Sequence, residues 1–398
     1  MQSLANQTGD RIVQLDALRG LAVIGIAWMN VYVFALPLQA YYNPIVLGGD
    51  APADRLVWLV SFVFIEDKFR TLFAMLFGAG CLILLEKSQE RAWRAHAARM
   101  AVLFSIGLAH SILLASNDVL RAYAIAGLAL PFLRGLSAPA LYAVATGLLA
   151  VHVGGGIVVF GSAVVDFYAG RLSTDAVIFA ERNFGALPGA VEYAMGLGRE
   201  GLLERILRRS ASITGQLAAL SGSLPINLAA MALGMGLWRD GMLSGKWRTF
   251  RMQRLAAACA LVAIPPLLAI GWWVADTGFP GALVGSAALI LSAPFDTLLG
   301  LAYALTVMAL LRPEGIVAQR LAAVGRLSLT NYVATSVIFA ALFASWGLGW
   351  FGEVSRSEAL GLSLVPIGAM LLWSPIWLSR FGQGPIERLW RYTARLFS

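Results

Sequence analysis

A histidine and an aspartate stand eight positions apart in surroundings that are otherwise apolar. His110 lies near the end of one apolar run, and Asp118 follows after the short polar turn Ser116-Asn117. If the chain reverses at this turn, the Asp118 carboxylate can return to the imidazole. A carboxylate beside a histidine selects the ring tautomer that accepts a proton, as general-base catalysis requires. The alternative is a structural histidine that hydrogen-bonds to a neighbouring helix, and the residues alone leave both hypotheses open.

Several cations stand in or beside the apolar runs, where they could hold an anionic ligand. Arginine makes bidentate contacts with phosphate and carboxylate, and lysine supplies a compact positive charge. The same cations could instead neutralise acids nearby. Asp16 and Arg19 are three residues apart and would share one face of a helix, and the Glu66-Asp67 pair could form a solvated helix end with the cations that follow it. The candidate anion-binding residues are Arg19, Lys68, Arg70, Arg121 and Arg326.

Other polar side chains interrupt the apolar runs and are candidates for lining a substrate channel. A charged group near the bilayer centre costs at least about 2.5–3.5 kcal/mol on insertion scales, so such groups are functional candidates by default. Serine and threonine at a helix start could equally serve as caps or as contacts between helices. The candidate channel residues are Asp16, Asn30, Tyr123, Asn331, Tyr332 and Ser336.

The elements that must position these residues are membrane helices. Hydrophobic residues make up 59% of the 398 positions and charged residues only 13%, whereas a soluble domain is about one-quarter charged. We therefore expect an all-α, polytopic helical membrane protein with about ten transmembrane helices, or eleven if the apolar segment 56–65 also crosses. The expected helices are 15–36, 69–85, 100–115, 119–133, 138–165, 213–238, 255–274, 283–311, 327–346 and 360–378.

One transmembrane domain is expected over residues 11–392, preceded by the polar tail 1–10 and interrupted by a long extracytoplasmic loop at 161–209. Lysine and arginine concentrate around 87–99, 239–254, 312–326 and 380–395, in connections that alternate with nearly cation-free ones. The positive-inside rule then places both termini in the cytoplasm. A short helix on the membrane surface is expected near 200–209.

The remaining composition excludes several classes of function. The net charge of +8 is distributed between apolar runs, unlike the gathered cations of a nucleic-acid binder. Two cysteines within apolar runs and three scattered histidines offer no disulfide framework and no metal-ligand spacing. Nucleic acid, metal and disulfide chemistry are therefore not expected.

Several motifs resemble the bacterial YeiB-type membrane family. They are the opening Arg11–Asn30 pattern with Leu15-Asp16-x-Leu18-Arg19-Gly20, the Lys68-Phe69-Arg70 block ending in Gly78-x-Gly80, and the His110 to Ala124 segment. Gly325-Arg326-x-x-Leu329-Thr330-Asn331-Tyr332 and the closing Gly384-Pro385-Ile386-Glu387-x-x-Trp390-Arg391 complete the set. The blocks occur in family order from residue 11 to residue 392. The family is more distantly similar to heparan-alpha-glucosaminide N-acetyltransferase and other transmembrane acyltransferases.

This resemblance implies acyl transfer from an acyl-CoA, such as acetyl-CoA, to a hydroxyl or amine acceptor that is a small molecule or lipid-linked. In that hypothesis His110 and Asp118 are catalytic, and the enzyme lies in the bacterial cytoplasmic (inner) membrane, with the lipid bilayer as its partner and a homodimer as a candidate assembly. The distant acetyltransferase carries its active histidine in the loop after the first helix. Residues 37–54 contain no histidine here, so His110 would have to take that role.

Two other functions fit the same residues. A transporter or flippase of a small anionic or lipid-linked solute would also use charges within the membrane and a helix kinked near Pro294 and Asp296. A non-catalytic membrane scaffold is the third hypothesis. Binding of acetyl-CoA is required only by the acyltransferase.

Overall fold

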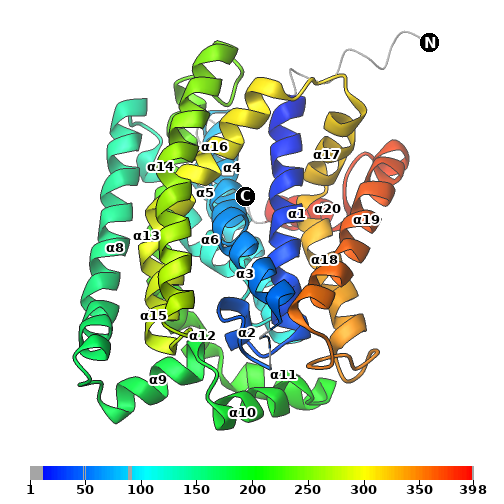
Figure 1. Ribbon diagram of the computed structural model, residues 1–398. Coiled ribbons are helices and arrows are strands. Elements are labelled where there is room, and N and C mark those ends of the chain that lie inside the picture. The colour runs from blue at the N-terminus through cyan, green and yellow to red at the C-terminus, as the bar shows by residue number, and fades with distance from the viewer. Residues whose placement is uncertain (1–11, 48, 50, 88–91, 397–398) are drawn as a thin grey trace.

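The computed structural model describes residues 12–47, 49, 51–87 and 92–396, and every regular element in these ranges is a helix. The expected polar tail 1–10 lies outside the described residues. Figure 1 shows the long helices running side by side in one bundle. The first helices are α1 (Val13–Ala35), α2 (Gln39–Tyr42), α3 (Pro52–Phe64), α4 (Lys68–Lys87), α5 (Ala92–Leu113), α6 (Val119–Gly127), α7 (Leu130–Leu133), α8 (Ala138–Tyr168), α9 (Thr174–Phe184) and α10 (Pro188–Gly198). The others are α11 (Leu202–Ala211), α12 (Ile213–Leu220), the 3₁₀ turn η1 (Ser221–Ser223), α13 (Leu224–Arg239), α14 (Thr249–Asp276), α15 (Gly281–Ser286), the π turn η2 (Ala287–Leu291), α16 (Ala293–Leu310), α17 (Ile316–Arg326), α18 (Ser328–Phe343), α19 (Arg356–Phe381) and α20 (Pro385–Leu396).

The membrane-spanning character of the bundle is confirmed by helix length and apolarity. The described residues contain eight spans that are long and apolar enough to cross a bilayer, or nine if α17 and α18, bent by 81° at their junction, are counted as one. This is fewer than the ten expected. The segment 119–133 divides into α6 and α7, of nine and four residues, and a bilayer crossing needs about 20. These two short helices pack within the bundle against α5, α13 and α4.

Two other expected helices are built differently from the prediction. The segment 283–311 is broken, because α15 ends at Ser286, a π turn follows, and α16 begins beside Pro294. Proline suits the first turn of a helix because its missing N–H would have no partner there. The segment 56–65 belongs to α3, which forms one long apolar span with α4. The two helices are separated by a turn in which Asp67 has a φ of 58°.

The connections between helices gather at two opposite ends of the bundle. In Figure 1, α9, α10 and α11 lie across the lower end, whereas the α13–α14 and α16–α17 connections lie at the upper end with the start of α1. The expected loop 161–209 is therefore largely helical, since α8 continues to Tyr168 and three helices follow; α11 is the surface helix expected there. The upper connections carry the arginines, so the positive-inside rule assigns this end to the cytoplasm. The C-terminal α20 returns to the same end, because Trp390 Nε1 donates to the Arg99 carbonyl oxygen near the start of α5 at 2.9 Å.

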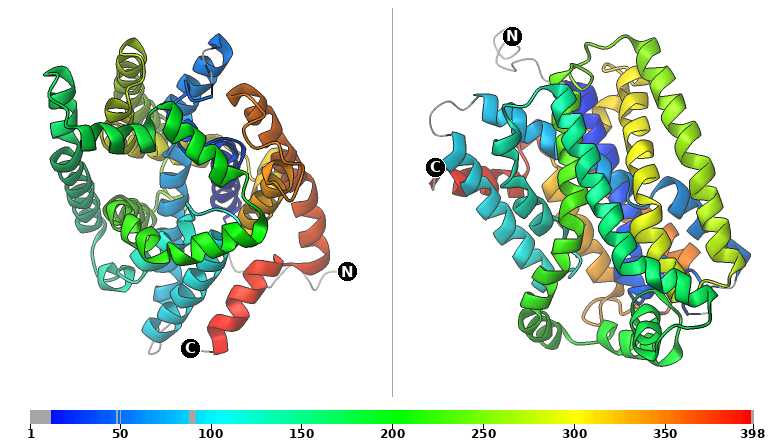
Figure 2. Two further views of the ribbon diagram at one scale, coloured as in Figure 1. Left: turned by 90° about the horizontal axis from the view of Figure 1, so that it is seen from below. Right: turned by 90° about the vertical axis from the view of Figure 1, so that its left-hand side faces the viewer.

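Close contacts at glycines hold the helices that carry the candidate residues. A Cβ on Gly20 of α1 would lie 2.1 Å from the Leu321 carbonyl oxygen of α17, and one on Gly234 of α13 would lie 1.8 Å from the Met75 carbonyl oxygen of α4. No larger side chain fits these positions. Small residues at such contacts let membrane helices pack backbone against backbone, where dispersion forces are strongest. The inner helices α1, α4, α13 and α17 thus form a tightly packed centre, and Figure 2 shows α8 at its periphery.

Candidate functional site

Three side chains from separate elements form a continuous set of polar contacts inside the bundle. His110 Nδ1 on α5 lies 2.8 Å from Asp118 Oδ2, and Nε2 lies 2.9 Å from the Ser336 hydroxyl oxygen on α18. All three residues are at most 4% exposed. The expected contact between His110 and Asp118 is confirmed. Ser336, expected only as a channel residue, joins them, and these three residues are called the relay below.

The turn before α6 fixes Asp118. Its Oδ1 accepts a hydrogen bond from the backbone N–H of Arg121 at 3.0 Å, so Asp118 is the N-cap of α6. Its Oδ2 lies 3.4 Å from the Tyr332 hydroxyl, which donates to it. A carboxylate accepts only, so the imidazole hydrogen belongs on Nδ1 and the Nε2 lone pair faces Ser336. This order of groups is that of a Ser–His–Asp proton relay.

Gly107 allows α5 to approach this turn. A Cβ at Gly107 would lie 2.5 Å from Asp118 Oδ1 and 2.9 Å from the Arg121 backbone nitrogen. Both distances are shorter than a carbon atom tolerates, so any side chain here would push α5 away from Asp118. Sequence reasoning did not select Gly107, because a glycine in an apolar helix is common and carries no chemistry of its own.

A small cavity of about 80 Å³ lies next to the relay, behind Tyr332. The Tyr332 ring lines the cavity, and its centroid is 5.0 Å from that of the His110 ring. Asn30, Arg70 and Asn117 also line this space. Two of the expected channel residues and one expected anion-binding cation thus surround one cavity, and Tyr332 forms the wall between it and the imidazole.

The two cations that begin α4 are both paired with acids. Lys68 Nζ lies 2.6 Å from Asp296 Oδ1 of α16, and both side chains are at most 2% exposed; Lys68 also donates to the Phe62 carbonyl oxygen. Arg70 binds Asp67 through two nitrogens, Nε and Nη2, each at 2.9 Å. Sequence reasoning had cited Asp296 only beside a helix kink. Its partner lies on a distant helix, so local spacing could not identify the pair.

The other expected anion-binding residues lie in three different places. Arg19 Nη1 donates to Asp16 Oδ1 at 2.8 Å, which confirms the expected contact. Arg121 is fully buried and donates to Gln216 Oε1 at 3.0 Å and to the Ser116 carbonyl oxygen at 2.7 Å. Arg326 lies at the cytoplasmic end, where its Nη2 donates to the Gly382 carbonyl oxygen at 3.3 Å. The five cations therefore do not converge on one anion site.

Two expected channel residues are engaged in contacts between helices. Tyr123 donates from its hydroxyl to the Arg70 carbonyl oxygen at 2.8 Å and is fully buried. Asn331 donates to the Val324 carbonyl oxygen at 3.0 Å and accepts from Trp373 Nε1 at 3.0 Å, which ties the α17–α18 bend to α19. Both side chains therefore position neighbouring backbone.

Glu387 was not selected from the sequence, although it lies in one of the resemblance motifs. Its Oε1 accepts from the backbone N–H groups of Leu329 at 2.8 Å and Thr330 at 3.1 Å, and its Oε2 accepts from the Thr330 hydroxyl. The carboxylate therefore caps the N-terminus of α18, the helix that carries Ser336, with the favourable sign for the helix dipole. Two motifs nearly 60 positions apart meet in this contact.

Arg356 is a second buried charge outside the sequence-based set. It begins α19, is 3% exposed, and donates to the Ala40 and Tyr41 carbonyl oxygens of α2 while its guanidinium lies 4.1 Å from the Tyr32 ring centroid. It is the one cation in the connection 347–359. That isolation was the available indication of a structural role.

Comparison with known proteins identifies the family. A protein named YeiB from Escherichia coli K12, itself described as uncharacterized, is 32% identical over 389 residues, which cover 96% of this chain and 96% of that protein. The chain belongs to the YeiB family. The YeiB-family protein YxaH of Bacillus subtilis 168, also described as uncharacterized, is 25% identical over 96% of this chain and 94% of its own. A family model described as "Protein of unknown function (DUF418)" matches residues 237–396 of this YeiB-family chain. No solved structure matches it.

Proposed function

We propose that this YeiB-family protein is an acyltransferase of the bacterial cytoplasmic membrane, which moves an acyl group from an acyl-CoA to a hydroxyl or amine. The relay of Ser336, His110 and Asp118 is the observation that supports this proposal. A buried histidine placed between a carboxylate and a hydroxyl is equipped to remove the hydroxyl proton, and general-base catalysis contributes about 10²–10⁴-fold in rate. The acetyl-CoA donor comes from the resemblance to transmembrane acyltransferases.

The first chemical step in this proposal uses Ser336 as the nucleophile. His110 Nε2 takes the hydroxyl proton while Oγ attacks the thioester carbonyl, the new C–O bond forms, and the C–S bond breaks. The proton on the imidazolium then passes to the CoA thiolate. In the second step His110 deprotonates the acceptor, which attacks the Ser336 ester and releases the serine hydroxyl. Asp118 holds the imidazole and stabilises its charged form in both steps.

The cavity behind Tyr332 is the proposed path of the acyl group. Tyr332 separates this cavity from the imidazole, so a change of its side-chain rotamer would connect the two. The relay belongs to the extracytoplasmic half of the bundle, because Arg209 of α11 donates to the Ile112 carbonyl oxygen at the end of α5 at 3.5 Å. A donor from the cytoplasm and an acceptor from the other side would then meet within the membrane.

Covalent labelling tests the proposal. Purified protein is mixed with radiolabelled acetyl-CoA, and peptide mass spectrometry locates the retained acetyl group. We expect label on Ser336 in the wild type, no label in Ser336→Ala, and labelling slowed about 10²–10⁴-fold in His110→Ala. Ser363→Ala is the matched control, because Ser363 is also a fully buried serine of a long helix. Wild-type labelling in both Ser336→Ala and His110→Ala would show that the relay is structural.

The second candidate function is a transporter or flippase of a small anionic or lipid-linked solute. The ion pair between Lys68 and Asp296 favours it, because charges buried inside a membrane domain often mark the path of a solute or proton. The break between α15 and α16 beside Asp296 has the form of the discontinuous helices of transporters. Calorimetry with acetyl-CoA separates the two candidates. Absence of binding to the purified protein would favour transport.

A further inference from the structure

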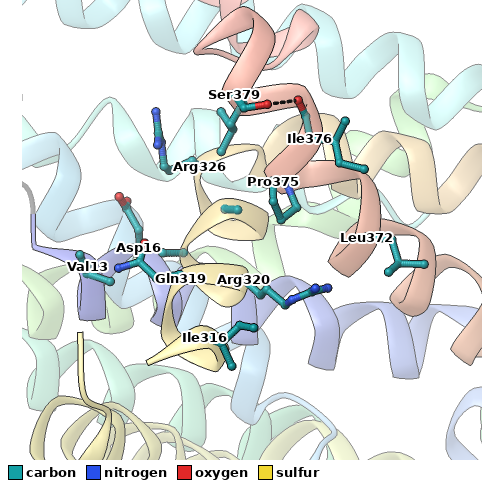
Figure 3. A pocket seen from close by; sticks show the side chains of 13 residues that line it. Val13, Asp16, Ile316, Gln319, Arg320, Arg326, Leu372, Pro375, Ile376 and Ser379 are labelled. Atoms are coloured by element: carbon teal, nitrogen blue, oxygen red, sulfur yellow. Dashed lines mark hydrogen bonds between the residues drawn. The ribbon is translucent and has the colours of Figure 1, made fainter. Parts of the chain in front are cut away.

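A groove separate from the relay lies between α1, α17 and α19. Figure 3 shows Asp16 on α1, Arg320 and Arg326 on α17, and Leu372 and Ile376 on α19 around it. Its volume is about 620 Å³, within the range of about 300–1,000 Å³ that is usual for small-molecule sites. It borders the cytoplasmic part of α19, so a ligand there could not reach the relay at the other end of α18.

The apolar wall of the groove is open to the bilayer. Ile316, Leu372 and Ile376 are 71%, 63% and 59% exposed. These residues lie on helices of the membrane domain, so the solvent that meets them is hydrocarbon. A molecule with an alkyl chain can therefore enter the groove sideways from the lipid phase and pack against these three side chains.

The polar part of the groove is positively charged. Arg320 is exposed, and Arg326 is half-buried; each guanidinium also donates to a main-chain oxygen of the α19 region, at Leu371 (3.5 Å) and Gly382 (3.3 Å). The acid of the groove, Asp16, is 2.8 Å from Arg19. Two arginines therefore face the groove against one carboxylate that already has a cationic partner. Planar guanidinium groups of this kind match the geometry of a phosphate.

We propose that the groove binds an anionic phospholipid of the cytoplasmic leaflet, with its phosphate at Arg320 and Arg326 and one acyl chain along Ile316, Leu372 and Ile376. Charge and apolar exposure both point to this occupant. A soluble phosphate would leave the apolar wall unused, and a zwitterionic headgroup would bring its own cation next to the arginines. A bound lipid would bridge α17 and α19 and so stabilise the bend that leads into α18.

Native mass spectrometry of the delipidated protein tests the proposal. Phosphatidylglycerol and phosphatidylcholine with identical acyl chains are titrated separately. We expect tighter binding of phosphatidylglycerol. Arg320→Gln should weaken it about fivefold, and Arg320→Gln/Arg326→Gln about 25-fold, as expected for about 1 kcal/mol per arginine at a membrane surface. Arg312→Gln is the control, because Arg312 is an exposed arginine of the same end that does not line the groove.

Three results would overturn the proposal. Equal affinity for both lipids in wild type and double variant would show that the arginines do not select the headgroup. Binding of glycerol phosphate as tight as that of phosphatidylglycerol would show a soluble-phosphate site. Acetyl-CoA binding that is lost in Arg320→Gln would make the groove a CoA site, and it would support acyl transfer at the same time. Because Arg326 also contacts α19, the double variant must melt within a few degrees of wild type, and Arg320→Gln alone carries the test if it does not.

Discussion

The pair formed by Lys68 and Asp296 allows a quantitative prediction for stability. With 2.6 Å between the charged atoms, the Coulomb attraction at an effective dielectric of about 20 is about 6 kcal/mol. Removing two ions from water costs several kcal/mol each, so attraction and desolvation nearly cancel. The net contribution of the intact pair is therefore small. A single charge left behind retains its desolvation cost without the attraction.

Lys68→Met and Asp296→Leu should therefore each lower the free energy of unfolding by about 3–5 kcal/mol, and the double variant should lose much less. Cys81 and Cys259 provide the assay, since they are the two cysteines of the chain and both are buried. A dye that fluoresces on reaction with thiols reports their exposure as the protein unfolds on heating in detergent. We expect melting temperatures in the order wild type, double variant, then either single variant.

The reasoning fails if the single and double variants melt together, or if the double variant is the least stable. The first result would mean that solvent or lipid headgroups reach the remaining charge. The second would mean that the pair stabilises the bundle beyond the cost of its burial. Arg171→Gln is the control, because its ion pair with Asp166 is largely exposed and should contribute about 0–1 kcal/mol.

Three other predictions follow from the packing. Gly107→Ala should displace Asp118 and reduce acyl transfer at least tenfold, whereas Gly147→Ala, whose Cβ meets nothing within 4 Å, should leave activity unchanged; equal activity would remove Gly107 from the site. Glu387→Gln weakens the cap of α18 and should cost about 1–3 kcal/mol of unfolding free energy, measured by the same thiol assay; an unchanged melting temperature would contradict the cap. Reporter fusions should read cytoplasmic after Gly245 and extracytoplasmic near Leu187, and the opposite result at either position would reverse the orientation.

The sequence predicted the class of fold well because apolar length is a local property. A run of about 20 apolar residues must cross a bilayer whatever its neighbours do. The failures arose where packing decides. The segment 119–133 is apolar enough to cross but turns near Gly127, because α6 and α7 find their contacts inside the bundle.

The candidate site was predictable only where its members are near in the chain. His110 and Asp118 are eight residues apart across one turn, so their contact followed from a hairpin. Ser336 joins them from α18, more than 200 positions away, and no spacing rule connects it to His110. Lys68 could not be matched with Asp296 for the same reason, and its interpretation as an anion-binding residue had no way to include that partner.

The distance in sequence between Lys68 and Asp296 has a consequence for how the protein is made. Asp296 follows 228 residues after Lys68, so at about 5–20 residues per second the ribosome needs roughly 10–50 s to supply it. During this interval α4 is already in the membrane with an ammonium group that will find its acid only in α16. An intramembrane charge costs at least about 2.5–3.5 kcal/mol on insertion scales, so the first half of the chain cannot reach its final packing before the second half arrives. Assembly of the bundle around α4 is therefore a late event in biogenesis, and a chain truncated before α16 would expose an unneutralised lysine to the proteases that survey the membrane.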